Sequence, residues 1–239
     1  MNVVCFVFTL CITGIFPAVM LIGLLAGRRR YLKSYFAGLA TFLVFQILLR
    51  VPILNRMSSM GWQSILFLKS PWLYALFLGF TAALFEEGGR FLTMKLFIKK
   101  ERGAWEDVVF GVGHWAMEAL YIIGINAVYT LFMNPGLIAV MGSNFFIGGL
   151  ERLFVLPVHV AFSVMVMQAV RERKYFWLVL AVFLHAAVDA YCVLAQTVWG
   201  MGIVEIEGSI AAIGILLFIY IIITKRGRKK NVPLKEEAH

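Results

Sequence analysis

The chain has 239 residues, of which 62% are hydrophobic and only 15% are charged, whereas soluble globular proteins have about 45–50% apolar and about 25% charged residues. So much apolar surface cannot be buried in a water-facing fold, so the composition excludes a soluble enzyme, a secreted disulfide scaffold and a disordered protein. It indicates an integral membrane protein. The net charge of +9 does not indicate nucleic-acid binding, because the basic residues gather at the ends of apolar segments.

Seven segments are long enough to cross a bilayer, because a helix needs about 20 apolar residues to span its hydrocarbon core. The predicted spans are 3–27, 34–54, 71–98, 107–133, 148–170, 175–198 and 208–224. They predict an all-α fold, a polytopic transmembrane helical bundle that forms a single domain over residues 1–224. A short basic and polar cytosolic tail is expected over residues 225–239.

Basic residues follow every second span, and this alternation predicts the orientation of the bundle. Seventeen of the 22 Lys and Arg residues lie after the first, third, fifth and seventh spans: Arg28, Arg29, Arg30, Lys33, Lys95, Lys99, Lys100, Arg102, Arg171, Arg173, Lys174, Lys225, Arg226, Arg228, Lys229, Lys230 and Lys235. Because basic loops stay in the cytosol, the N-terminus is expected outside and the C-terminus inside the cell.

Ionisable residues interrupt four of the apolar spans. They are Glu86, Glu87, Arg90, His114, Glu118, Glu151, Arg152, His159, His185 and Asp189. A charge near the bilayer centre costs about 2.5–3.5 kcal/mol when it faces lipid, so these groups are expected to face one another or a wet cavity. Helical rise places eight of them in one layer, about 10–20 Å from the cytosolic ends of their helices. Glu151 and Arg152 are expected outside that layer, near the outer face.

Within the helices, the polar residues repeat with a spacing of four. Glu86 and Arg90, His114 and Glu118, and His185 and Asp189 are such pairs, and residues four apart share one face of a helix. Glycines lie beside them at Gly88, Gly89, Gly111 and Gly113. These glycines either admit backbone or substrate to a site or serve close helix packing.

This set of side chains suits the active site of a hydrolase. Because two adjacent carboxylates repel each other, one of Glu86 and Glu87 could act as a base while Arg90 holds the other as an anion. A histidine could orient and help to deprotonate water, and a second one could donate to a developing oxyanion. Alternatively His114, His159 and His185 with a glutamate could bind zinc, although the zinc-protease sequence H-E-x-x-H is absent from the chain.

Three motifs resemble those of the CAAX protease and bacteriocin-processing clan of intramembrane proteases. Glu86-Glu87-Gly-Gly-Arg90 resembles E-E-x-x-(x)-R, Phe110-Gly-Val-Gly-His114 resembles F-x-x-x-H, and His185-Ala-Ala-Val-Asp189 resembles H-x-x-x-N/D. Within this clan the chain most resembles the YhfC family of bacterial intramembrane peptidases. The similarity in size and span layout covers nearly the whole chain.

The resemblance implies catalytic roles for five residues and supporting roles for three. Glu86 or Glu87 would be the catalytic base, His114 would share in activating water, and His185 with Asp189 would stabilise the oxyanion. Arg90 would orient the glutamates, while Glu118 and His159 would support the site or complete a metal site. The glutamate pair is one residue closer to Arg90 than in the CAAX proteases, as in the E-E-x-x-K motif of PrsW-type proteases, so the choice between Glu86 and Glu87 stays open. Asp189 replaces an asparagine, so as a donor it would be protonated or act through His185.

The sequence therefore predicts an intramembrane endopeptidase of a bacterial cytoplasmic membrane, with a site open to the cytosolic half of the bilayer. The expected partners are a peptide or membrane-protein substrate and the lipid bilayer, and no nucleic acid; the oligomeric state is left open. A glutamic-type enzyme would need no cofactor, whereas a metal-dependent one would need a divalent ion such as zinc. The alternatives are a proton-coupled transporter, in which the polar groups form a relay, and a non-catalytic membrane interaction protein.

Overall fold

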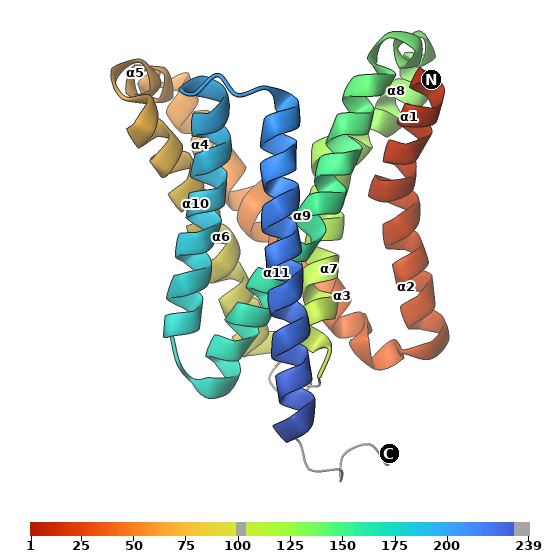
Figure 1. Cartoon of the computed structure of the whole chain (residues 1–239), viewed down its shortest axis with the longest axis vertical. Coiled ribbons are helices and arrows are strands. Elements are labelled where there is room, and N and C mark those ends of the chain that lie inside the picture. Colours follow the sequence, from red (N-terminus) through yellow and green to blue (C-terminus); the bar gives the residue numbers. More distant parts are fainter. Residues whose placement is uncertain (99–103, 232–239) are drawn as a thin grey trace.

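A computed structural model describes residues 1–98 and 104–231, with side chains up to Gly227 (Figure 1). In these residues every regular element is a helix, which confirms the predicted all-α polytopic fold. Lys99, Lys100, Arg102 and Lys235, which the sequence places in basic segments, lie outside the described residues, as does the predicted tail from residue 232 onward.

The elements follow one another along the chain with short connections. They are α1 (Asn2–Leu10), η1 (Cys11–Ile15), α2 (Phe16–Gly27), η2 (Arg29–Tyr31), α3 (Leu32–Thr41), η3 (Phe42–Arg50), α4 (Val51–Ser59), α5 (Trp62–Lys69), α6 (Pro71–Phe97), α7 (Glu106–Ala119), η4 (Leu120–Gly124), α8 (Ile125–Met133), η5 (Pro135–Leu137), α9 (Ile138–Glu172), α10 (Phe176–Thr197) and α11 (Ile203–Asn231). Several of these elements join end to end, so the elements from α1 to α2 form one continuous helical segment, and those from α7 to α8 form another.

Six helical segments among the described residues are long and apolar enough to cross a membrane. They are 2–27, 29–59, 106–133, 135–172, 176–197 and 203–227. The third predicted span is α6, a helix of 27 residues. It is more polar than the six segments above, because it contains Glu86, Glu87 and Arg90. This long helix begins where its sequence indicates, because Ser70 accepts the Leu73 backbone N–H at 3.3 Å and Pro71 occupies the first turn. The number of crossings and their orientation stay predictions.

Two predicted boundaries differ most from the structure. The fifth span was expected to begin at residue 148, but α9 begins at Ile138, because Gly142, Ser143 and Asn144 interrupt the apolar run without interrupting the helix. The tail was expected from residue 225, whereas α11 continues to Asn231. Lys225 is only 8% exposed, since it forms an ion pair with Asp107.

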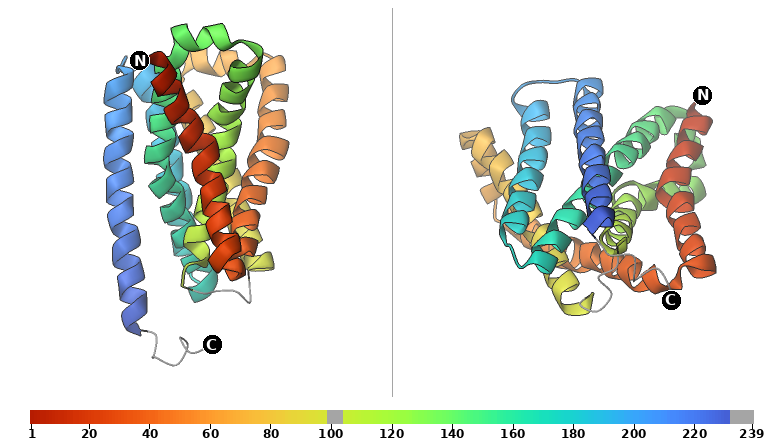
Figure 2. Two further views of the ribbon diagram at one scale, coloured as in Figure 1. Left: turned by 90° about the vertical axis from the view of Figure 1, so that its right-hand side faces the viewer. Right: turned by 60° about the horizontal axis from the view of Figure 1, so that its bottom comes forward.

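Close helix packing positions the polar residues. The main neighbours are α6 with α10, α3 with α7, and α9 with α1, α7 and α11, and the views in Figure 2 show α9 running obliquely through the bundle. A Cβ built on Gly111 of α7 would lie 2.7 Å from the Cα of Val160 on α9, and one on Gly113 would overlap the Tyr35 carbonyl oxygen on α3. Of the two readings that the sequence left open, these glycines therefore serve helix packing.

An apolar core fills the end of the bundle opposite the N-terminus. Buried side chains of α6, α7, α9 and α10 meet there, among them Met94, Phe110, Phe162, Val166 and Ala181. This packing fixes the relative positions of the four helices that carry the ionisable residues.

Candidate functional site

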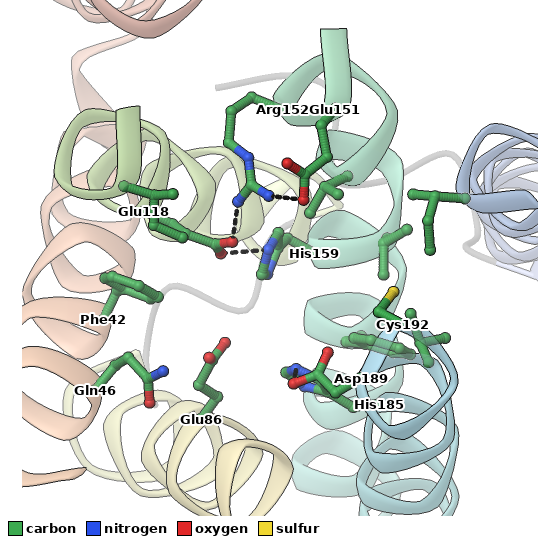
Figure 3. Close-up of a pocket in the computed structure, with 16 residues that line it drawn as sticks. Phe42, Gln46, Glu86, Glu118, Glu151, Arg152, His159, His185, Asp189 and Cys192 are labelled. Atoms are coloured by element: carbon green, nitrogen blue, oxygen red, sulfur yellow. Dashed lines mark hydrogen bonds and ion pairs between the residues drawn. The ribbon is translucent and has the colours of Figure 1, made fainter. Parts of the chain in front are cut away.

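A cavity of about 200 Å³ lies in the middle of the bundle, and its lining combines apolar and polar side chains (Figure 3). The polar lining residues are Gln46, Glu86, Glu118, Glu151, Arg152, His159, His185 and Asp189. Seven of these eight were singled out in the sequence as ionisable residues within spans. Gln46 was not, although a lone glutamine in the apolar segment 42–49 is a signal of the same kind.

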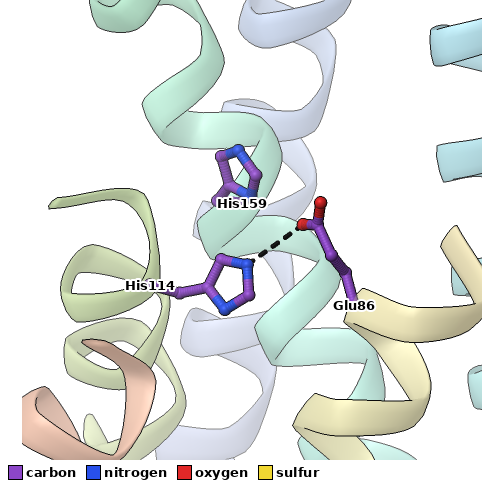
Figure 4. A group of neighbouring side chains, drawn as sticks. All are labelled: Glu86, His114 and His159. Atoms are coloured by element: carbon purple, nitrogen blue, oxygen red, sulfur yellow. Dashed lines mark hydrogen bonds and ion pairs between the residues drawn. The ribbon is translucent and has the colours of Figure 1, made fainter. Parts of the chain in front are cut away.

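Glu86, His114 and His159 face one another from three different helices (Figure 4). His114 Nε2 lies 3.0 Å from Glu86 Oε2, and the rings of His114 and His159 are 5.3 Å apart between centroids. All three residues are buried, with exposed fractions of 5% or less. The structure thus brings α6, α7 and α9 together at one polar centre, as the helical depths predicted.

Glu87 points to a different set of partners. Its Oε1 forms an ion pair with Arg90 Nη1 and lies 2.7 Å from His185 Nδ1, and the residue is fully buried. Arg90 also reaches Glu86 Oε2 at 3.5 Å and donates to His159 Nδ1 at 2.6 Å. Arg90 therefore holds the two glutamates and His159 together, as its predicted orienting role requires.

Arg152 belongs to the site, contrary to the prediction that it lies outside the polar layer. Its Nη1 binds Glu118 Oε1 and its Nη2 binds Glu151 Oε1, while Glu118 Oε2 lies 2.5 Å from His159 Nε2. The long arginine side chain carries its charge away from its own backbone, so counting helical rise alone misplaced it. Glu151 does lie at the edge, since its side chain is 36% exposed.

His185 lines the cavity beside Asp189. Its Nε2 lies 3.6 Å from Asp189 Oδ2, so the pair shares one face of α10 as predicted. The ring stacks on Phe162 at 5.1 Å between centroids and 13° between planes, which fixes its orientation. Asp189 is thus close enough to His185 to act through it, as the sequence-based prediction allowed.

Two histidines and a glutamate of this cluster suit a divalent metal ion. Glu86, His114 and His159 each offer a ligand atom, and these atoms all lie within 4.8 Å of one another. Three nitrogen and oxygen ligands with an open fourth position are typical of catalytic zinc sites. The prediction named three histidines, but His185 lies outside this group and contacts Glu87 and Asp189 instead.

The surroundings of the group also fit a cation. The connected cluster holds five carboxylates, of Glu86, Glu87, Glu118, Glu151 and Asp189, and two guanidinium groups, of Arg90 and Arg152. Five negative charges would thus face two positive ones. A divalent ion would offset part of this excess of negative charge, as protonated histidines would.

Comparison with known proteins identifies the family. A family model described as YhfC intramembrane metalloprotease matches residues 15–141 and 133–210, which include every residue of the cluster. The chain belongs to the YhfC family. An uncharacterized membrane protein YhfC of Bacillus subtilis (strain 168) is 28% identical over 250 residues, which cover 91% of this chain and 95% of that protein.

Membership of the YhfC family confirms the resemblance drawn from the three motifs. With the six apolar helices it also confirms an integral membrane protein, and the Bacillus relative agrees with a bacterial cytoplasmic membrane. No solved structure matches the chain.

Proposed function

We propose that this protein is an intramembrane endopeptidase whose reactive centre is formed by Glu86, His114 and His159. The observation that carries the proposal is the burial of these three side chains together inside an apolar bundle, with Glu86 and His159 lining a cavity. Ionisable groups at this depth are costly unless they serve a site, and the description of the YhfC family as intramembrane metalloproteases supports proteolysis.

Glu86 rather than Glu87 would act on the substrate. Glu86 lines the cavity and has a direct contact to His114, whereas Glu87 is fully buried and shares one oxygen between Arg90 and His185. Glu87 would therefore be a positioning residue that keeps Arg90 and His185 in place.

The site supports two forms of water activation. In a glutamic-type enzyme, Glu86 would accept the proton of the attacking water while His114 orients both. In a metal-dependent enzyme, Glu86, His114 and His159 would hold a divalent ion such as zinc, which supplies Lewis-acid activation of water and substrate carbonyl. Glu118, beside His159 and facing the same cavity, would then accept the proton, and Arg152 would keep Glu118 in place.

His185 would stabilise the oxyanion of the tetrahedral intermediate. Glu87 holds Nδ1 of the ring at 2.7 Å, and Nε2 reaches the cavity beside Asp189. A ring with protons on both nitrogens would donate to Glu87 and to an oxyanion at the same time. Such a preorganised donor is worth about 10²–10³-fold in rate in other hydrolases.

A cleavage assay tests the proposal. The purified protein in liposomes is incubated with a library of peptides and single-span proteins, and the products are identified by mass spectrometry. We expect the wild type to cleave and Glu86→Gln to lose about 10²–10⁴-fold of that activity, the usual contribution of a general base. The matched control is Glu172→Gln, because Glu172 lies at the end of α9 and its contact with Lys174 is exposed.

The same assay separates the alternatives. Inhibition by a chelator, with recovery on adding zinc, supports the metal-dependent form, and insensitivity to chelator supports the glutamic type. Equal cleavage by the wild type and Glu86→Gln would overturn the proposal. Folded protein that cleaves nothing but moves protons in response to a pH gradient would favour the transporter.

A further inference from the structure

The lining of the cavity is exposed on one side only. α9 begins at the end of the bundle where the N-terminus lies, and α10 returns to that end (Figure 1). Two carboxylates of the lining that are partly exposed lie toward it, Glu151 two turns before His159 on α9 and Asp189 one turn after His185 on α10. Their side chains are 36% and 38% exposed, respectively, whereas His159 and His185 are 4% and 5% exposed.

On the opposite side the cavity is closed by apolar packing. Phe162, which stacks on His185, is fully buried. Beyond it, Met94 of α6, Val166 of α9 and Ala181 of α10 are also fully buried in one continuous apolar cluster. Because these side chains are apolar and fully buried, this part of the described core offers water no path to the cavity, although the Ser163 hydroxyl is buried beside Phe162.

The exposed carboxylates indicate that the open side holds water rather than lipid. Each would cost about 2.5–3.5 kcal/mol if it faced hydrocarbon in the middle of the bilayer. A third carboxylate lies nearby, because Glu207 at the start of α11 interacts electrostatically with Glu151 and Arg152. Its Oε2 is buried without a hydrogen-bond partner among the described residues, so a water molecule is the natural partner.

We infer that water and substrate reach the site from the extracytoplasmic half of the bilayer, and that the substrate is a membrane-anchored segment whose scissile bond lies in the outer half of its span. The positive-inside rule makes the end with the N-terminus the outer one. The inference rests on the proposed function, and it replaces the sequence-based expectation of a site open to the cytosolic half. Hydrolysis of this bond would give a product whose newly formed chain terminus lies at the outer surface.

The native cysteine Cys192 is a probe for the side of access. It lines the cavity five residues before the end of α10, about 8 Å along the helix. The test uses the full chain with Cys5→Ala and Cys11→Ala, so that Cys192 is the single thiol, in right-side-out and inverted membrane vesicles. A charged, membrane-impermeant thiol reagent is added at alkaline pH, and labelling is measured by mass spectrometry.

Three control positions are placed in a chain in which Cys192 is also alanine. Thr197→Cys reports access from the end of the bundle where the N-terminus lies, because Thr197 is exposed at the end of α10. Lys174→Cys reports access from the opposite end, where its side chain is 70% exposed. Ala181→Cys is the matched buried control, because it lies in the apolar cluster one turn before His185. Val155→Cys is a second cavity position, on a different helix from Cys192.

We expect Cys192, Val155→Cys and Thr197→Cys to be labelled in right-side-out vesicles and protected in inverted ones. Lys174→Cys should show the reverse pattern, and Ala181→Cys should be protected in both. Labelling of the cavity positions from the cytosolic side, or from neither side while Thr197→Cys and the denatured protein react, would overturn the inference. Because labelling needs no turnover, this outcome is independent of whether the protein proves to be a peptidase.

Discussion

At the scale of single residues, neighbouring carboxylates lie in different environments because their partners differ. Glu86 and Glu87 are adjacent in sequence, but only Glu86 reaches the cavity, while Glu87 is held by Arg90 and His185. The three histidines divide in the same way. His114 and His159 share a centre with Glu86, and His185 is held by Glu87 and Asp189.

This division predicts which histidines affect metal content. If the protein is metal-dependent, the wild type should carry about one divalent ion per chain, and His114→Gln and His159→Gln should lose it. His185→Gln is the matched control and should keep the ion, because His185 lies outside the ligand group. Elemental analysis of the purified variants measures this directly. Loss of the ion in His185→Gln alone, or a wild type that takes up no zinc, would contradict the proposed ligands.

At the scale of elements, the site depends on how closely α7 approaches its neighbours. Gly111 lets α7 contact the backbone of α9, and Gly113 lets it contact α3 on the other side. His114 follows directly, so its position is set by two backbone contacts rather than by its own side chain. Gly88 on α6 differs, since a Cβ there would meet nothing within 4 Å.

Adding one methyl group to α7 should therefore disturb the site. Gly113→Ala forces the methyl against the Tyr35 carbonyl oxygen, and overpacking of this kind typically costs about 1–3 kcal/mol. We expect a lower free energy of unfolding in detergent and reduced cleavage. Gly88→Ala should leave the stability unchanged or raise it by up to about 1 kcal/mol, because the methyl group meets open space and alanine is the better helix former. Equal effects of the two substitutions would show that α7 is not fixed by this contact.

At the scale of the whole molecule, the fold is apolar outside and charged inside. Large side chains such as Leu76, Phe183 and Ile215 are more than half exposed, as suits a surface that faces lipid. The ionisable groups instead lie in the middle of the bundle. At the predicted cytosolic end, Lys225 of α11 binds Asp107 at the start of α7 and the Ala104 carbonyl oxygen at 2.6 Å, which joins the last helix to the rest.

The orientation of the whole bundle can be measured with reporter fusions. Because the basic residues predict a cytosolic C-terminus, green fluorescent protein fused after His239 should fluoresce, and alkaline phosphatase fused there should be inactive. Fusions after Trp199, in the connection between α10 and α11, should give the opposite pair of results. The reverse pattern at both positions would invert the predicted topology and, with it, the side of access to the cavity.

The sequence alone determined the class of the fold and most members of the site. Apolar length and the alternation of basic segments do not depend on tertiary contacts, so most helix ends could be placed within about five residues, although α9 begins ten residues before the predicted start of its span. The cost of burying a charge in a bilayer marked Glu86, His114, His159 and His185 as candidate site residues, because such residues in a span must have partners. The spacing of four predicted which of them share a helix face.

Only the tertiary structure decided which side chain meets which. Helix rotation, tilt and side-chain reach separate Glu86 from Glu87, place His185 with Glu87 rather than with the other histidines, and bring Arg152 to Glu118. The side on which the cavity opens was also decided there, because it depends on where Phe162 and Met94 pack and where Glu151 and Asp189 remain exposed. These are relations between helices far apart in the chain, and local sequence patterns carry no information about the angles at which helices cross.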